Sequence, residues 1–167
     1  IQVAAYLGGE LVLDAWAGVA DPATGRKVDG ETLFPVFSTS KGIAATVLNI
    51  LIGRGRLDPE KPIARYWPEF AAHGKDRITL RQGLAHLAAL PQVPELKSLD
   101  EALDWKHICA LVAQEKPLWE PGTRMAYHAI SWGWLVGEVA CRVEGKTFGQ
   151  ILEDELKWPL GIQALYL

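Results

Sequence analysis

The sequence predicts an α+β fold in which a short N-terminal β-hairpin precedes a mostly helical chain. Two apolar, β-prone runs meet at Gly8-Gly9, a dipeptide typical of tight hairpin turns. From Ser38 onward, apolar residues recur at helical spacing between capping and turn residues. With 167 residues, of which 49% are hydrophobic and 22% charged, the chain is a globular domain or part of a larger one.

The chain is predicted to be one partial domain in two parts. Residues 1–36 contribute a hairpin and a loop to the sheet part, and residues 37–167 form the mostly helical part. Residues 21–31 are polar and rich in turn residues, which indicates a loop. Because a lone hairpin is marginally stable in water, we expect further strands to complete the sheet. These strands would come from a partner chain or from a C-terminal segment absent from these 167 residues.

Apolar periodicity and caps predict the helices of the second part. They cover residues 38–55, 79–88, 98–115, 126–145 and 147–158. Thr79 is the predicted cap of the second helix, and Gly145 closes the fourth. Capping boxes are predicted for the third and the fifth helix, from Ser98 with Glu101 and from Thr147 with Gln150. Residues 56–70 contain three prolines, so we expect an extended surface loop there.

Composition excludes several functional classes. The formal net charge of −3 and the lack of a basic block argue against nucleic-acid binding. No run approaches the ~18 apolar residues of a membrane span. Cys109 and Cys141 lie in apolar helical patterns and are interpreted as buried free thiols, and the four histidines lack the spacing of metal ligands. The sequence does not decide whether the protein is cytoplasmic or is exported to the periplasm or the cell exterior.

The stretch FSTSKG, residues 37–42, suggests a catalytic pair at the start of a helix. Ser38 has an ordinary structural interpretation as an N-cap, which Thr39 or Ser40 would serve equally well. Positions i and i+3 share a helix face, however, so Lys41 can direct its amine at the Ser38 hydroxyl. The free N–H groups of a first helical turn also favour negative charge that develops beside the serine. A serine with such a base becomes a candidate nucleophile.

Tyr127 is a second candidate. It follows the Pro121-Gly122 turn at the expected start of the 126–145 helix. A tyrosine there is often a core residue with its hydroxyl at the rim. A phenol close to a lysine ammonium is instead driven towards phenolate and can relay protons.

These stretches resemble motifs of the serine β-lactamase, D-alanyl-D-alanine peptidase and related esterase superfamily. VFSTSKG resembles its nucleophile motif S-x-x-K. ITLRQGLAHLAALP resembles its pattern I-T-V-R-x-L-L-x-H-x-A-G-L-P, and EPGTRMAYHAISWGWLVGEV resembles its tyrosine-motif region. The resemblance covers nearly all 167 residues as the N-terminal portion of the fold. It is closest to the class C-like branch, which includes the family VIII carboxylesterases.

The resemblance implies a fold and a chemistry. The fold would be β-lactamase/penicillin-binding-protein-like, with an antiparallel sheet, flanking helices and a helical region. Ser38 would be acylated, while Lys41 and Tyr127 would share proton transfer. The Ser38 backbone N–H would be half of an oxyanion hole. Water would release the acid, and no cofactor or metal would be needed.

The chain departs from the family pattern at three places. Tyr127-His128-Ala129 stands where lactamases usually have Y-x-N, so an amide is absent. Ala89 stands where the His-containing stretch usually has glycine. The third motif, K-T-G or a variant, is missing, since Lys146-Thr147 is followed by phenylalanine between two helices. We therefore expect these 167 residues alone to be weakly active or inactive.

Function is predicted as a serine hydrolase that acts on carboxylic esters. The alternatives are a β-lactamase or D-alanyl-D-alanine peptidase, with a β-lactam-like substrate, or a non-catalytic homologue with a binding role. Trp105, Trp119 and Trp132 are the predicted substrate-binding residues, because with Trp134 they could wall an acyl pocket. The alternative for each tryptophan is ordinary core or rim packing.

Overall fold

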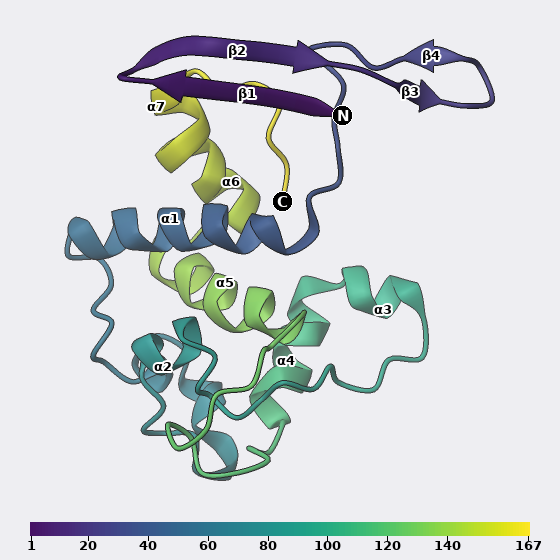
Figure 1. Cartoon of the computed structure of the whole chain (residues 1–167). Coiled ribbons are helices and arrows are strands. Elements are labelled where there is room, and N and C mark those ends of the chain that lie inside the picture. Colours follow the sequence, from purple (N-terminus) through teal and green to yellow (C-terminus); the bar gives the residue numbers. More distant parts are fainter. The chain divides into compact units, whose positions relative to one another are not determined.

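The computed structural model describes residues 1–167, except for the side chain of Leu99. The chain divides into two compact units, Ile1–Val36 and Phe37–Leu167. Strands make up the regular structure of the first unit, and helices that of the second (Figure 1). No helix in the described part of the chain is both long and apolar enough to span a lipid bilayer.

Two antiparallel ribbons form the first unit. The strands are β1 (Gln2–Leu7), β2 (Glu10–Trp16), β3 (Val19–Asp21) and β4 (Arg26–Lys27). β1 pairs with β2 around Gly8 and Gly9, whose φ angles are +59° and +88°. Glycine adopts such left-handed angles without steric cost, so the predicted hairpin forms at this dipeptide.

The short β3–β4 ribbon corrects the loop predicted for residues 21–31. The Asp21 carboxylate accepts hydrogen bonds from the Ala23 N–H at 2.9 Å and from the Thr24 hydroxyl at 2.7 Å. These bonds close a tight turn, and β3 and β4 pair on either side of it. Turn-forming residues therefore mark a second hairpin here and not an open loop.

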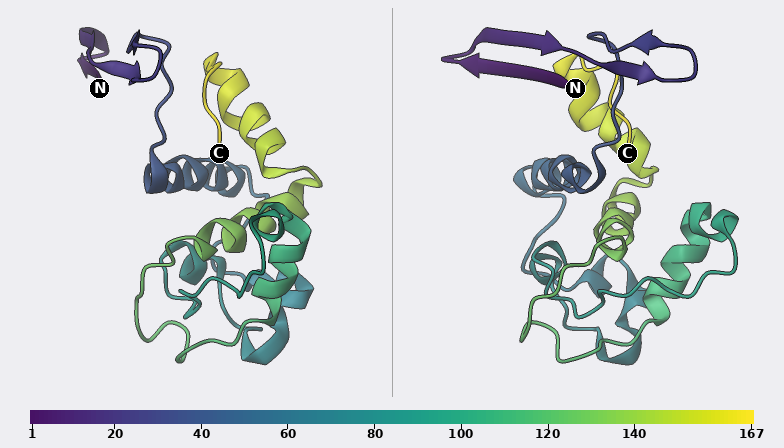
Figure 2. Two further views of the ribbon diagram at one scale, coloured as in Figure 1. Left: turned by 90° about the vertical axis from the view of Figure 1, so that its right-hand side faces the viewer. Right: turned by 45° about the vertical axis from the view of Figure 1, so that its right-hand side comes forward.

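Helices dominate the second unit. They are α1 (Ser40–Gly53), α2 (Leu80–Leu84), α3 (Leu99–Leu103), α4 (Trp105–Gln114), α5 (Ser131–Glu144), α6 (Phe148–Leu152) and α7 (Trp158–Leu160). Short 3₁₀ helices occupy η1 (Phe37–Thr39), η2 (Ile63–Arg65) and η3 (Pro68–Gly74), and η4 (Glu153–Lys157) is a π-helical turn between α6 and α7. α5 packs against α1, α2, α4 and α6, so it lies at the centre of the unit (Figures 1 and 2).

One apolar core joins these helices. Its fully buried members include Val47, Leu48, Leu51, Ile63, Phe70, Leu80, Ile108, Leu135, Val136, Val139 and Ile151. They come from α1, α2, α4, α5, α6 and the η2–η3 segment. Burial of this kind contributes roughly 25 cal/mol per Å² of apolar surface, which fixes the helices that carry the candidate site.

The prediction of one helix over residues 98–115 is wrong at Asp104. Asp104 is extended (φ −79°, ψ 94°), and its carboxylate accepts the His107 N–H at 3.1 Å. It thereby ends α3 and caps α4. The predicted box at Ser98 forms only in part, because Ser98 Oγ accepts from the Glu101 N–H while the Glu101 carboxylate accepts from the Lys97 N–H.

Two further boundaries differ from the sequence prediction. Residues 56–70 are not an extended loop, because η2 and the start of η3 fold within them. Proline fits there because Pro68 lies in the first turn of η3, where its missing N–H costs nothing. The helix predicted from residue 126 begins only at Ser131. Thr79 and Thr147 form complete capping boxes with Gln82 and Gln150, which confirms those two caps.

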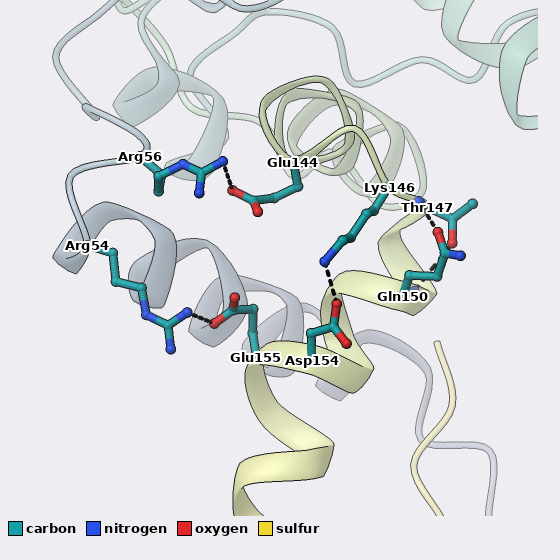
Figure 3. Close-up of polar contacts among 8 residues, drawn as sticks. All are labelled: Arg54, Arg56, Glu144, Lys146, Thr147, Gln150, Asp154 and Glu155. Atoms are coloured by element: carbon teal, nitrogen blue, oxygen red, sulfur yellow. Dashed lines mark hydrogen bonds and ion pairs between the residues drawn. The ribbon is translucent and has the colours of Figure 1, made fainter.

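Polar contacts connect the end of α1 with the end of α5 and with η4, and the residues after α5 with η4 (Figure 3). Arg54 forms an ion pair with Glu155, and Arg56 forms one with Glu144 at 3.1 Å. Lys146 Nζ contacts the Asp154 carboxylate at 2.7 Å. The Lys146–Asp154 pair is exposed and contributes ~1 kcal/mol or less, whereas the side chains of Glu144 and Glu155 are largely buried.

Candidate active site

Ser38 lies in η1, directly before α1. The N-cap position of α1 is occupied by Thr39, so the capping role considered for Ser38 is not the one it takes. Phe37, the residue before the serine, has a φ of +45°, in the left-handed region that side chains seldom adopt. Strain of this kind is often found at functional sites and costs on the order of 1 kcal/mol or more.

Two side chains meet at the Ser38 hydroxyl. Lys41 Nζ donates a hydrogen bond to Ser38 Oγ at 3.0 Å, and the Tyr127 hydroxyl donates one at 2.6 Å. Lys41 Nζ also donates to the Ala129 carbonyl oxygen at 2.6 Å. The structure thus brings together Ser38, Lys41 and Tyr127, the three predicted catalytic residues, although Tyr127 is 89 residues from the serine.

The environment of Tyr127 lowers the pKa of its phenol. The hydrogen bond with Ser38 and then the nearby Lys41 ammonium lower the pKa of the Tyr127 phenol below its ordinary value. Lys41 Nζ lies 5.0 Å from the centroid of the Tyr127 ring. Once ionised, the phenolate can accept the proton of an attacking hydroxyl and return it to a leaving group.

The sequence predicts Tyr127 in the first turn of a helix, but in the structure it lies ahead of α5. Residues 126–130 are irregular, because their polar groups bond to the segment 86–90. The Ala126 N–H donates to the His86 carbonyl oxygen, and the Ser131 hydroxyl donates to that of Leu90. These bonds hold Tyr127 ahead of α5 and turn its hydroxyl to Ser38.

Sequence reasoning missed His86 and His128 at this site. Their ring centroids are 5.5 Å apart, and the His86 centroid is 5.0 Å from that of Tyr127. One signal was available in the sequence: each lies in one of the motif stretches, His86 in ITLRQGLAHLAALP and His128 beside Tyr127.

A cavity of about 390 Å³ extends from Ser38 and Lys41 between α1 and α5. Its lining is mainly apolar and includes Phe37, Ala44, Trp105, Ile130, Trp132, Trp134, Val136 and Phe148. The predicted residues Trp105 and Trp132 therefore border the same space as the serine. Trp119 is not among the described residues that line it, and its indole N–H donates to the Arg124 carbonyl oxygen at 3.1 Å.

Trp105 is held in its position from two sides. Its indole N–H donates to the Glu138 carboxylate at 2.7 Å, and Arg142 binds the other carboxylate oxygen of Glu138 at the same distance. A Cβ added at Gly137 would lie 2.9 Å from Trp105 Cη2, closer than side chains pack. Glycine at this position allows the indole to lie against α5.

Neither a metal site nor a reactive thiol is indicated near these residues. Among the described residues, no group of three or more His, Cys, Asp or Glu side chains could hold a metal ion. Cys109 is buried and Cys141 partly buried, and both are free thiols. Burial raises the pKa of each thiol, to about 11 for Cys141, so both favour the inert protonated form.

The family model described as Beta-lactamase matches residues 1–167, the whole chain. The chain belongs to the beta-lactamase family. The resemblance found in the sequence is thereby confirmed, and the fold class with it, because solved structures of beta-lactamase-like and penicillin-binding-protein-like proteins superpose on the chain.

Three relatives illustrate the family. Esterase/beta-lactamase LipL of Mycobacterium tuberculosis (strain ATCC 25618 / H37Rv) is 36% identical over 99% of this chain and 38% of its own length. A family VIII carboxylesterase structure is 41% identical with a TM-score of 0.86, over 92% of this chain and 42% of that one. A penicillin-binding-protein homologue from Caulobacter crescentus is 37% identical with a TM-score of 0.89, over 96% and 43%. The chain thus spans about 40% of each relative's length.

The structure explains how this beta-lactamase-family chain accommodates its departures from the family pattern. Ala89 is buried with a φ of +60°, so the position usually held by glycine keeps the glycine-like backbone at a cost of ~1 kcal/mol. Ala129 lacks an amide but offers its carbonyl oxygen to Lys41. Lys146 pairs with Asp154 and Thr147 caps α6, so both have structural roles.

Proposed function

We propose that the protein containing this chain is a serine hydrolase that cleaves carboxylic esters through an acyl-enzyme intermediate on Ser38. One observation carries the proposal: Ser38 Oγ lies within hydrogen-bond distance of both Lys41 Nζ and the Tyr127 hydroxyl. A serine hydroxyl is a weak nucleophile until a neighbouring base removes its proton. Two such groups converge on this hydroxyl.

In the proposed mechanism, Ser38 Oγ attacks the ester carbonyl carbon while its proton passes to the phenolate form of Tyr127, which the adjacent Lys41 ammonium stabilises. The backbone N–H of Ser38 donates to the oxyanion that forms, aided by the partial positive charge at the start of α1. The carbon–oxygen bond to the alcohol then breaks, and the alcohol leaves with the stored proton. Water attacks the acyl-enzyme, releases the carboxylic acid and restores the Ser38 hydroxyl.

Esters are favoured over β-lactams for two reasons. Ala129 offers a substrate no side-chain amide, and a lost hydrogen bond in a partly buried site costs ~1 kcal/mol or more. The apolar cavity beside Ser38, by contrast, suits the acyl chain of a simple ester. The names of LipL and of the family VIII carboxylesterase support esters, and LipL's name also includes beta-lactamase.

The test is hydrolysis of p-nitrophenyl butyrate and nitrocefin by the full-length protein, with Ser38→Ala as the blank. We expect higher kcat/KM for the ester and no turnover above background in the variant. Equal or higher kcat/KM for nitrocefin would reject the ester preference. Ser38→Ala activity equal to wild type would reject the hydrolase mechanism itself.

A matched pair of variants tests the acyl pocket. Trp105→Ala removes a wall of the cavity, so we expect KM for the butyrate ester to rise about tenfold, the usual scale for lost apolar contact in a pocket. Trp119→Ala removes a tryptophan that lies off the cavity and should leave KM within about twofold. Equal effects of the two variants would contradict the assignment of the pocket.

A further inference from the structure

His86 and His128 form a hydrogen-bonded pair behind the tyrosine. The His128 backbone N–H donates to His86 Nδ1 at 3.1 Å. The Leu90 backbone N–H donates to His128 Nε2 at 3.0 Å, and His128 Nδ1 lies 2.6 Å from the Ala126 carbonyl oxygen. His128 is fully buried, and the centroid of the His86 ring lies 5.0 Å from that of Tyr127 and 6.1 Å from that of Trp132.

These contacts specify one protonation state for each ring. His128 Nε2 accepts a proton donor, so it carries no hydrogen, and Nδ1 must then hold the hydrogen that reaches the Ala126 carbonyl. His86 Nδ1 also accepts, which leaves its hydrogen on Nε2. A second proton on either ring would turn the accepting nitrogen into an N–H group that faces the backbone N–H of Leu90 or His128. Two buried donors that face each other are costly. The arrangement therefore needs both imidazoles neutral.

The pair constrains both groups that contact the Ser38–Lys41 site from this segment. His128 stands between Tyr127, whose hydroxyl bonds to Ser38, and Ala129, whose carbonyl oxygen accepts from Lys41. Residues 126–130 are not part of a helix. Their position follows from the bonds to residues 86–90, of which the two histidine rings make two. A third ring bond, between His128 Nδ1 and the Ala126 carbonyl oxygen, lies within the segment.

We propose that His86 and His128, both neutral, are positioning residues that hold the Tyr127 hydroxyl on Ser38 and the Ala129 carbonyl on Lys41. Neither histidine bonds to the reacting atoms, so their role is to fix the groups that do. The inference rests on the proposed serine hydrolase function and adds a dependence on histidine protonation.

The surroundings of the pair favour the neutral state. Burial, the neighbouring His128 and the Lys41 ammonium of α1 lower the pKa of His86, and burial lowers that of His128 against the opposing bond to the Ala126 carbonyl. The Tyr127 ring also lies beside His86, and α5 contributes the uncharged Trp132. The pair should stay neutral, and the tyrosine in place, to a pH below the ordinary histidine pKa of ~6.5.

A matched pair of variants of the full-length protein separates positioning from packing. His86→Asn keeps an acceptor near the place of Nδ1 and tolerates the left-handed backbone of this residue, whose φ is +62°. His86→Leu fills similar space without an acceptor. We expect His86→Leu to lower kcat for p-nitrophenyl butyrate about 10- to 100-fold with little change in KM, as loss of an orienting partner does. His86→Asn should stay within about fivefold of wild type.

Histidine NMR of the wild-type protein tests the same inference without turnover. Long-range ¹⁵N–¹H correlations at neutral pH should show hydrogen on Nδ1 of His128 and on Nε2 of His86. On acidification, kcat should fall as the first of the two rings gains its second proton. The opposite tautomer at His128, or a pair already protonated at full activity, would overturn the inference.

Labelling of Ser38 by a fluorophosphonate separates this inference from the proposed function. No labelling of the wild-type protein would overturn both the hydrolase mechanism and the positioning role. Wild-type labelling with an equal rate in His86→Leu would overturn the positioning role alone. Slower labelling in His86→Leu that is rescued in His86→Asn supports it, whether the preferred substrate is an ester or a β-lactam.

Discussion

Two lysines of the second unit sit in contrasting surroundings. Lys75 is fully buried, and its ammonium donates to the carbonyl oxygens of Ala72, Ala113 and Glu115 at 2.8, 3.0 and 2.5 Å. Lys41 donates to one carbonyl and to the hydroxyl of Ser38. Burial lowers the pKa of Lys75 to about 8, against the attraction of the Glu115 carboxylate.

The contrast shows that a shifted lysine pKa does not by itself mark a catalytic site. All three donors of Lys75 are used by main-chain carbonyls at the end of α4 and in η3, so its chemistry is structural. Lys41 directs one donor at a side chain that can attack a substrate. The environment of Lys41 is reactive because the Ser38 hydroxyl and Tyr127 lie beside its ammonium group.

The largest expected effect comes from Lys41→Met in the full-length protein. Without the amine, proton transfer from Ser38 loses a partner, and kcat/KM for p-nitrophenyl butyrate should fall about 10³- to 10⁴-fold. Thermal unfolding should change little, because Lys41 lies at a partly open site. A loss smaller than tenfold would mean that Tyr127 alone activates the serine, and the contrast between the lysines would lose its basis.

Lys75→Met should have the opposite profile. The variant keeps most of the side-chain volume but leaves buried carbonyl oxygens without the donor they share. The free energy of unfolding should fall by about 3 kcal/mol, measured by urea denaturation. Ester hydrolysis by the folded variant at 25 °C should match wild type. The exposed Lys116 offers the control, since Lys116→Met should leave the unfolding free energy within about 0.5 kcal/mol.

The sequence predicted the Lys41 environment far better than the Lys75 environment. Ser38 and Lys41 are three residues apart, so helix geometry alone brings them together. The predicted caps at Thr79 and Thr147 are local in the same sense, and the structure confirms them. Lys75 meets carbonyls 38 and 40 residues away, which no local pattern encodes.

The errors of prediction at the candidate site have a common cause. The segment at Tyr127 is apolar enough for a helix, yet its bonds to residues 86–90 outweigh that local preference. The sequence did not indicate a role for His128, because its hydrogen-bond partners Leu90 and His86 are 38 and 42 residues away. Non-local hydrogen bonds therefore decide the part of the site that periodicity and motif spacing leave open.

The smallest expected effect is a pH dependence that Lys75 imparts to stability. Its pKa is about 8 when folded and about 10.5 when unfolded, so the unfolded chain binds more protons between these values. Unfolding free energy should therefore rise with pH across this window and fall as pH is lowered towards 8. From about pH 8 to 9.5 the gain should be roughly 1.5 kcal/mol. Other groups also titrate here, so the quantity to measure is the wild-type slope minus the Lys75→Met slope in urea denaturation. A difference of zero would show that the buried ammonium keeps its ordinary affinity for protons, and that its three carbonyl partners compensate fully for the loss of water.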